Sequence, residues 1–251
     1  MLLLRVLLFL TWLLALFCNA AVAQDDRRVV SPDGQLEFHL FVNTQEESNL
    51  SRVAYQVRYR GQVLIDTSFL GFDLYGQEPL LGENVGLVRS SGAQSFPTYQ
   101  TITGHYMQNG SLGRLLDVEV RVYNDGVAFR YVIGKSAATE RLLIADEATE
   151  FDLPHDISAA LTVPFITPGK SGGWVAITEV PLPGFPRLQL GHEDPGGKIL
   201  LVRLTRPVGP AQLPDVVYDG KPPLTSPWRV VIVGAHRAQL LRSGILTSLR
   251  E

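Results

Sequence analysis

The sequence predicts an all-β domain of antiparallel strands, and three observations support this. Apolar and polar residues alternate over several runs, and a period of two places one face of each strand in a core. Dipeptides typical of turns separate these runs. After residue 23 no stretch carries a convincing helical stripe, and residues 137–148 come nearest to one. Many short strands between frequent turns are typical of a sandwich or a barrel.

The predicted strands are of two kinds. The first kind alternates apolar with polar residues, as expected of strands with one face in water; these are residues 36–42, 53–59 and 118–122. The second kind is apolar on both faces, which predicts burial between two layers; these are residues 127–133, 199–204 and 228–233.

Turn residues mark the ends of these runs. Asp125-Gly126 lies between two strand-like runs and predicts a two-residue hairpin turn. Other turns are expected at Asp33-Gly34, Arg60-Gly61 and Asp219-Gly220. We expect residues 76–113 to hold short strands between long loops, and the proline-rich residues 207–227 to form a surface loop.

Length and charge limit the function classes. The chain has 251 residues, 22 Lys plus Arg against 25 Asp plus Glu, and a formal net charge of −3. Without a basic block there is no electrostatic case for binding nucleic acid or anionic lipid. No internal repeat or linker divides the chain, so residues 24–251 are expected to form one domain.

Residues 1–23 read as a secretory signal peptide. Arg5 precedes a long apolar stretch, and Ala21-Val-Ala23 is a typical cleavage site. A membrane anchor is the rival interpretation, but the apolar core is short for a span. Cys18, the only cysteine, lies within this segment and follows the bulky Phe17, which disfavours a lipoprotein signal. We therefore expect an exported protein, periplasmic or extracellular, without disulfides.

Catalytic motifs are scarce. The five histidines lie far apart in the sequence with no pair at metal-ligand spacing, so a zinc site is not expected. There is no G-x-S-x-G and no phosphate-binding glycine loop. Glycoside hydrolysis needs two facing carboxylates, and five glutamates are candidates in principle, although most are expected to be solvated. They are Glu140, Glu147, Glu150, Glu179 and Glu193.

Glu179 and Trp174 are the strongest candidates for binding. Glu179 ends an apolar run just before a proline-bounded loop, a plausible place for a sugar or metal contact; its structural alternative is a loop carboxylate that caps backbone N–H groups. Trp174 follows two glycines and is a candidate stacking platform for a sugar ring, with core packing as the alternative. Trp228 heads an apolar strand, so core packing is the stronger interpretation there.

Several segments, in order, resemble the N-terminal domain of glycoside hydrolase family 97. The most specific is Arg121-Val-Tyr-Asn-Asp-Gly-Val-Ala-Phe-Arg-Tyr131. The others are Ser31-Pro-Asp-Gly34, Tyr55-Gln-Val-Arg-Tyr-Arg-Gly61, Ser68-Phe-Leu-Gly71, Glu147-Ala-Thr-Glu-Phe151, Ile177-Thr-Glu179, Thr225-Ser-Pro-Trp-Arg229 and Ser243-Gly-Ile-Leu246. Together they cover nearly all of residues 29–249. Residues 95–113 look shorter and less aromatic than in the family.

The resemblance implies a β-super-sandwich similar to galactose-mutarotase-like carbohydrate-binding domains. In the family this domain precedes a catalytic (β/α)8 barrel that cleaves α-glucosidic or α-galactosidic bonds and carries the catalytic carboxylates. It also implies an active-site calcium held mostly by the barrel, with Glu179 as the ligand from this domain. The chain ends about where that barrel would begin, so no catalytic residue is expected in it. Calcium is expected only if a barrel partner completes the site, because the ion takes six to eight oxygens.

Three functions follow as hypotheses. The first is an exported, non-catalytic carbohydrate-binding or accessory domain of an α-glycosidase, free-standing or docked on a separate barrel chain, with an α-glucoside or α-galactoside as ligand. The second is a fragment of a full-length enzyme that lacks its barrel. The third, mutarotase activity, rests on the fold alone and would need an acid and a base, for which His192 is the residue to test.

Overall fold

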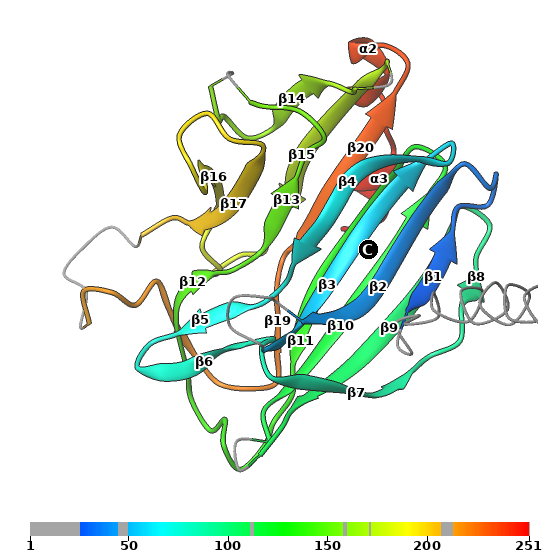
Figure 1. Cartoon of the computed structure of the whole chain (residues 1–251). Coiled ribbons are helices and arrows are strands. Elements are labelled where there is room, and N and C mark those ends of the chain that lie inside the picture. Colours follow the sequence, from blue (N-terminus) through cyan, green and yellow to red (C-terminus); the bar gives the residue numbers. More distant parts are fainter. Residues whose placement is uncertain are drawn as a thin grey trace, which may run out of the picture.

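The computed structural model describes residues 26–44, 50–110, 113–157, 160–170, 172–206 and 213–250. The expected signal peptide, residues 1–23, and Cys18 within it lie outside the described residues. The described chain forms antiparallel sheets arranged in layers, with two short helices near its C-terminal end (Figure 1). The predicted all-β class is confirmed. In the described part of the chain, no helix has the length and apolar character that a membrane crossing requires.

A four-stranded sheet forms the front layer in the order β1-β2-β3-β4 (Figure 1). Its strands are β1 (Arg27–Val30), β2 (Leu36–Thr44), β3 (Ser51–Tyr59) and β4 (Gln62–Phe69). The turn from β3 to β4 is Arg60-Gly61, where both residues have positive φ, as a tight hairpin turn requires. Two predicted strands and this predicted turn are thus confirmed.

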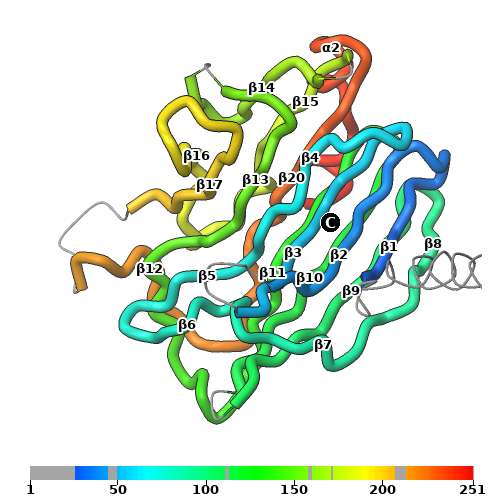
Figure 2. Tube along the Cα trace, in the orientation of Figure 1, coloured from blue at the N-terminus to red at the C-terminus, as the bar shows by residue number. Residues whose placement is uncertain are grey.

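A nine-stranded sheet forms the second layer, with the main order β14-β15-β20-β11-β10-β9-β7; β8 pairs with β9 and β19 pairs with β11. The strands are β7 (Val85–Ser90), β8 (Gln94–Ser95), β9 (Tyr99–Gln108), β10 (Leu115–Tyr123), β11 (Gly126–Ile133), β14 (Phe165–Pro168), β15 (Trp174–Val180), β19 (Leu224–Thr225) and β20 (Trp228–Gly234). The tube in Figure 2 shows the front sheet lying across this larger sheet.

Two smaller sheets extend the layers at one side. One has the order β18-β12-β5-β6 and the other β13-β17-β16, with β13 beside β4 (Figure 2). Their strands are β5 (Phe72–Leu74), β6 (Gln77–Leu81), β12 (Leu142–Glu147), β13 (Glu150–Asp152), β16 (Leu188–His192), β17 (Ile199–Leu204) and β18 (Tyr218–Gly220).

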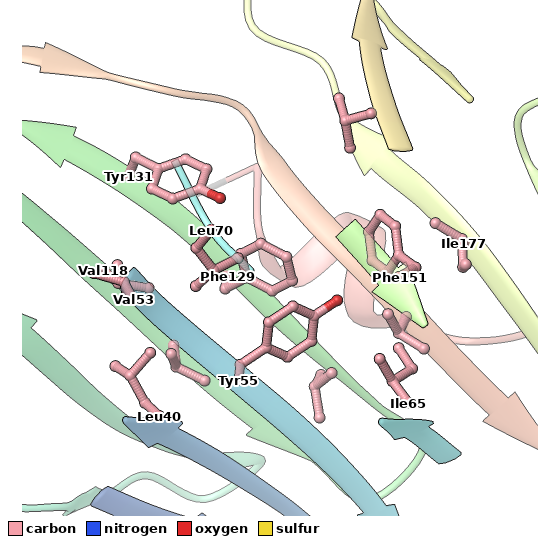
Figure 3. Packing of buried hydrophobic residues seen from close by; sticks show 14 of the residues in the cluster. Leu40, Val53, Tyr55, Ile65, Leu70, Val118, Phe129, Tyr131, Phe151 and Ile177 are labelled. Atoms are coloured by element: carbon pink, nitrogen blue, oxygen red, sulfur yellow. The ribbon is translucent and has the colours of Figure 1, made fainter. Parts of the chain in front are cut away.

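The main core lies between the layers and is rich in aromatic rings (Figure 3). Tyr55 on β3 stacks on Phe38 on β2, with 5.2 Å between ring centroids, and lies 5.1 Å from Phe129 on β11. Phe151 on β13 meets Tyr55 edge to face at 6.4 Å. The Tyr55 hydroxyl donates to the backbone carbonyl of Glu150 at 2.8 Å, so this buried polar group is satisfied.

A second, smaller core lies on the outer face of the nine-stranded sheet. Ala176, Val230 and Ile232 on that face pack against Leu240 and Ile245. The latter two belong to the helices α2 (Arg237–Leu240) and α3 (Ile245–Ser248). Both faces of β15 and β20 are therefore buried, which explains why the sequence of β20 is apolar without alternation.

Residues 137–148, the stretch that came nearest to a helical stripe, form a turn followed by β12, because residues 142–147 pair with β5 and β18. Three local predictions were wrong. The hairpin between β10 and β11 turns at Asn124 and Asp125, and Gly126 is already paired in β11. A Cβ on Gly126 would lie 2.4 Å from the carbonyl oxygen of Val231, so this glycine is required by the close approach of β20.

Asp219-Gly220 lies within β18 and is no turn. Residues 76–113 contain β9, a strand of ten residues, where only short strands were expected.

Candidate functional site: a buried carboxylate–arginine network

Glu179, the residue singled out from the sequence, lies near the end of β15, directly opposite Arg229 of β20. Alternation along β15 sends Val175, Ile177 and Glu179 to the inner face of the sheet. Val175 and Ile177 belong to the main core, and the Glu179 side chain is only 2% exposed. A carboxylate at this depth needs partners for both oxygens.

Arg229 is the first of those partners and the centre of the network. Its side chain is fully buried. Its Nη1 donates to Oε2 of Glu179 at 2.7 Å. Its Nε donates to Oε1 of Glu147 at 3.0 Å, and its Nη2 donates to Oε2 of the same carboxylate. One guanidinium therefore binds two carboxylates, one of them through two parallel hydrogen bonds.

Glu147 brings a second layer into the network. It is the last residue of β12, in a sheet that does not include β20, and its side chain is fully buried. Thr149 Oγ1 donates to Glu147 Oε1 at 2.7 Å, and the Thr149 oxygen is also hydrogen-bonded to the Tyr131 hydroxyl. The network thus joins β12, β11, β15 and β20 through side chains alone.

Arg187 closes the network on the solvent side. It lies just before β16, and its Nε donates to Oε1 of Glu179 at 2.5 Å. Its side chain is 61% exposed, unlike those of Arg229, Glu147 and Glu179. Its backbone is held in place by Thr205: the Arg187 N–H donates to Thr205 Oγ1, and the Thr205 N–H donates to the Arg187 carbonyl.

The charges in this cluster balance. Two carboxylates, Glu147 and Glu179, face two guanidinium groups, Arg229 and Arg187. Burial alone would lower the pKa of Arg229, but the adjacent Glu147 and Glu179 charges outweigh burial, and the net effect raises its pKa. Burial, together with the Glu147 charge, raises the pKa of the Tyr131 hydroxyl well above its usual value. Arg229 is therefore charged and Tyr131 neutral at physiological pH.

This arrangement does not fit a calcium ion bound by the chain itself. Both oxygens of Glu179 already accept hydrogen bonds from arginines, and the nearby Glu147 oxygens are bound by Arg229 and Thr149. Calcium requires six to eight oxygen ligands. Across the described ranges, no group of three or more His, Cys, Asp or Glu side chains could hold a metal ion.

The positions of the five candidate glutamates show which of them could form a catalytic pair. Of the five glutamates considered, the structure brings Glu147 and Glu179 to the same arginine, but both are buried and neutralised. Glu150 pairs with Arg52 at 3.3 Å, and Glu140 and Glu193 are exposed. An acid and a base must flank a substrate bond across a cleft. Glu147 and Glu179 do not meet that requirement.

Trp174, the other predicted binding residue, does not share a site with Glu179. The two lie five residues apart on β15, so their side chains point to opposite faces of the sheet. Trp174 is partly buried against the small core beneath α2 and α3. Trp228 is buried on the same outer face, where the Arg121 and Arg130 guanidinium groups lie 5.0 and 4.4 Å from its ring centroid. Trp228 thus packs in the core, as the sequence favoured.

A cavity of about 300 Å³ opens beyond the start of β15, at the opposite end of the strand from Glu179. His155, Asp156, Thr167 and Lys170 supply its polar lining. His155 Nε2 lies 3.3 Å from Thr167 Oγ1. His192, the residue considered for mutarotase chemistry, lies at the end of β16 and is not among the residues that line this cavity.

Sequence reasoning missed the two arginines that define the site. Arg229 interrupts an otherwise apolar strand, and a charge in that position requires a buried counter-charge. That signal was available in Trp228-Arg229-Val230. Arg187 carries no comparable signal, because an arginine after a proline in a loop is ordinarily solvated.

Comparisons with known proteins agree with this architecture. The family profile described as "Glycosyl-hydrolase 97 N-terminal" matches residues 29–163 and 156–251. A retaining alpha-galactosidase of Bacteroides thetaiotaomicron is 28% identical over 173 residues, which cover 64% of this chain and 24% of that protein. The chain therefore spans about a quarter of the length of this curated relative.

Solved structures show the same fold. A family 97 glycoside hydrolase from Pseudoalteromonas sp. strain K8, in complex with acarbose, superposes with a TM-score of 0.73 at 19% identity, over 90% of this chain and 38% of that chain. A beta-arabinopyranosidase gives a TM-score of 0.64 at 19% identity, over 84% of this chain and 40% of that chain. With a profile match across nearly all described residues and this shared fold, the chain belongs to the glycoside hydrolase family 97 N-terminal domain family.

Proposed function

We propose that this chain is a non-catalytic, carbohydrate-binding accessory domain that works with the catalytic barrel of an α-glycosidase, on the same polypeptide or on another. One observation carries the proposal: the two carboxylates that the fold brings together, Glu147 and Glu179, are buried and bound in ion pairs, both with Arg229 and Glu179 also with Arg187. Glu147 and Glu179 therefore cannot serve as a paired acid and base, and the proposal assigns hydrolysis to residues of a barrel.

The sugar class follows from the relatives and is part of the proposal. The curated relative is named an alpha-galactosidase, and one relative of known structure binds acarbose. We propose an α-galactoside or an α-glucoside as the ligand, with Trp174 as the stacking residue. Export to the periplasm or the cell exterior is proposed from residues 1–23. We propose calcium binding only in a complex in which a barrel supplies most of the ligands.

Calorimetric titration of the purified chain with panose, melibiose and, as a β-linked control, cellobiose tests the proposal. We expect saturable binding of an α-linked sugar and no hydrolysis. Trp174→Ala should abolish binding without unfolding the domain. Tyr75→Ala is the matched control, because Tyr75 is an exposed aromatic residue in the turn between β5 and β6.

Two outcomes would overturn the proposal. Release of monosaccharide by the purified chain would show that it is an enzyme by itself. Failure to bind every α-linked sugar tested, together with failure to bind a separately purified family 97 barrel, would exclude an accessory role. Sugar binding that survives in Trp174→Ala would keep the function but place the site elsewhere.

A further inference from the structure

Glu179 is bound by two arginines that differ in burial: Arg229 is buried and Arg187 is exposed to solvent. Arg229 holds Oε2 from inside the core and is shared with Glu147. Arg187 holds Oε1 from the solvent side. Without Arg187, the buried part of the network consists of two carboxylates and one guanidinium, a net charge of −1. An uncompensated buried charge is strongly unfavourable, so the site requires one more cation.

We propose that Arg187 is the built-in cation of this site and fills the place at Glu179 Oε1 that a metal ion would otherwise take. The resemblance of this chain to family 97 implies a calcium ion at Glu179. In the structure the positive charge beside Glu179 Oε1 is the guanidinium of Arg187. The proposal goes beyond the accessory function, because it concerns the isolated chain and requires neither a sugar nor a barrel.

Three features favour a cation that belongs to the chain over a bound one. The Arg187 backbone is held by two hydrogen bonds to Thr205, which positions the guanidinium beside Glu179. The contact is charge-assisted, and such hydrogen bonds are about twice as strong as neutral ones. In the wild-type chain every carboxylate oxygen of Glu147 and Glu179 already accepts a hydrogen bond from an arginine or a hydroxyl, so none of the four is free for calcium.

Removal of the Arg187 side chain should therefore create a cation site. We would measure the thermal unfolding midpoint of the full chain against increasing calcium chloride, and separately against methylguanidinium, at constant ionic strength. In the wild-type chain we expect no saturable rise with either ion. In Arg187→Ala we expect a lower midpoint without added cation, and a saturable recovery with methylguanidinium, calcium or both.

Matched variants make the test specific. Arg203→Ala removes another partly exposed arginine from an ion pair, since Arg203 lies 3.6 Å from Asp146, whose side chain is 29% exposed against 2% for Glu179, and should gain no cation response. Arg187→Lys keeps the positive charge and should stay insensitive to calcium. The double variant Arg187→Ala with Glu179→Gln should lose the response that Arg187→Ala gains, because the buried carboxylate is gone.

Each outcome decides the proposal. It stands if the cation response of Arg187→Ala appears at concentrations about tenfold or more below any response of the wild-type chain. It is overturned if calcium stabilises the wild-type chain as strongly as Arg187→Ala. It is also overturned if Arg187→Ala responds to neither methylguanidinium nor calcium, whether its midpoint is lowered or unchanged. Sugar binding is not read in this experiment, so failure here leaves the accessory function to be judged by its own titration.

Discussion

Glu147 at the end of β12 and Arg229 on β20 form a fully buried ion pair with two parallel hydrogen bonds, and this pair links two separate sheets. Buried ion pairs stabilise a fold less than their contacts suggest, since each charge loses its hydration. Loss of one partner, however, leaves an unpaired buried charge and is strongly destabilising. The pair therefore acts to specify how these two sheets align, and the first two predictions follow from that.

Replacement of Arg229 by methionine should destabilise the protein severely. Arg229→Met fills a similar volume but leaves Glu147 and Glu179 buried with one partner fewer each. The expected loss is about 3–5 kcal/mol of unfolding free energy, the usual cost of breaking a buried ion pair from one side. Urea unfolding followed by tryptophan fluorescence measures it. Arg203→Met is the control and should cost about 1 kcal/mol or less, as for other exposed pairs; equal losses would contradict the network's importance.

The two carboxylates should not be equivalent. Glu147→Gln presents an amide N–H₂ to Arg229, which has only donors, at a fully buried position; we expect a loss of about 3–5 kcal/mol. Glu179→Gln should cost less, about 1–2 kcal/mol, because Arg229 keeps Glu147 and the exposed Arg187 can turn to water. Denaturant titrations of both variants give the order directly. A reversed order would mean that Glu179, and not Glu147, anchors the arginine.

Two buried tyrosines should govern stability at alkaline pH. Burial raises the pKa of Tyr55 well above 10.0 and does the same for Tyr131, so both stay neutral in the folded state. Their contribution to stability is full below the unfolded pKa near 10 and is lost as the pH rises towards the folded pKa. Above the unfolded pKa, the free energy of unfolding should fall by about 1.4 kcal/mol per pH unit for each tyrosine.

Unfolding at several alkaline pH values, followed by tyrosinate absorbance, tests this expectation. Tyr55→Phe removes one of the two groups, so its stability should fall less steeply with pH than that of the wild-type chain. Tyr75→Phe is the control for the loss of a tyrosine outside the core, because Tyr75 is exposed. Identical slopes for Tyr55→Phe and the wild-type chain would show that Tyr55 ionises within the folded protein.

Strands could be predicted from the sequence where one face is buried and the other is solvated, because apolar and polar residues then alternate. In β2, β3 and β10 one face meets the core and the other meets solvent, so a period of two is written into the residues. Residues 142–147 lie in the stretch that came nearest to a helical stripe because leucine, alanine and glutamate suit a helix locally, and pairing with β5 and β18 overrides that preference. Gly126 was read as a turn glycine, although its requirement comes from β20, a strand about a hundred residues later in the chain.

The site was predictable only in part, for a similar reason. The position of Glu179 at the end of an apolar run identified it as unusual, but a loop carboxylate was an equal alternative, and only the structure shows the side chain buried on β15. Its partners could not be read from the sequence, because Arg229 lies 50 residues away and meets Glu147 across 82 residues. Pairing between distant strands determines which charges meet, and local patterns do not encode it. Trp174 and Glu179 were both binding candidates from the sequence, and the structure places them on opposite faces of β15.

A last prediction concerns Asp73 on β5. Burial is the main cause that raises the pKa of the Asp73 carboxyl from 3.8, and the negative charge of Glu78 is the second cause. Because the folded pKa is the higher one, the contribution of this group to stability is full below pH 3.8 and is lost as the pH rises through the folded value. Asp73→Asn, which stays neutral, should therefore be more stable than the wild-type chain near neutral pH, by about 0.5 kcal/mol or less because the carboxyl is only partly buried and solvent screens its charge.

The advantage of Asp73→Asn should vanish below pH 3.8, where the wild-type carboxyl is also neutral. Urea titrations at neutral and acidic pH measure it, and Glu78→Gln supplies the control for the charge contribution. In a Glu78→Gln background the gain from Asp73→Asn should shrink but persist, because burial, the larger cause, remains. A gain that disappears entirely in that background would assign the raised pKa to Glu78 instead of to burial. An Asp73→Asn chain less stable than wild type at neutral pH would mean that the carboxylate makes a favourable contact that outweighs both causes.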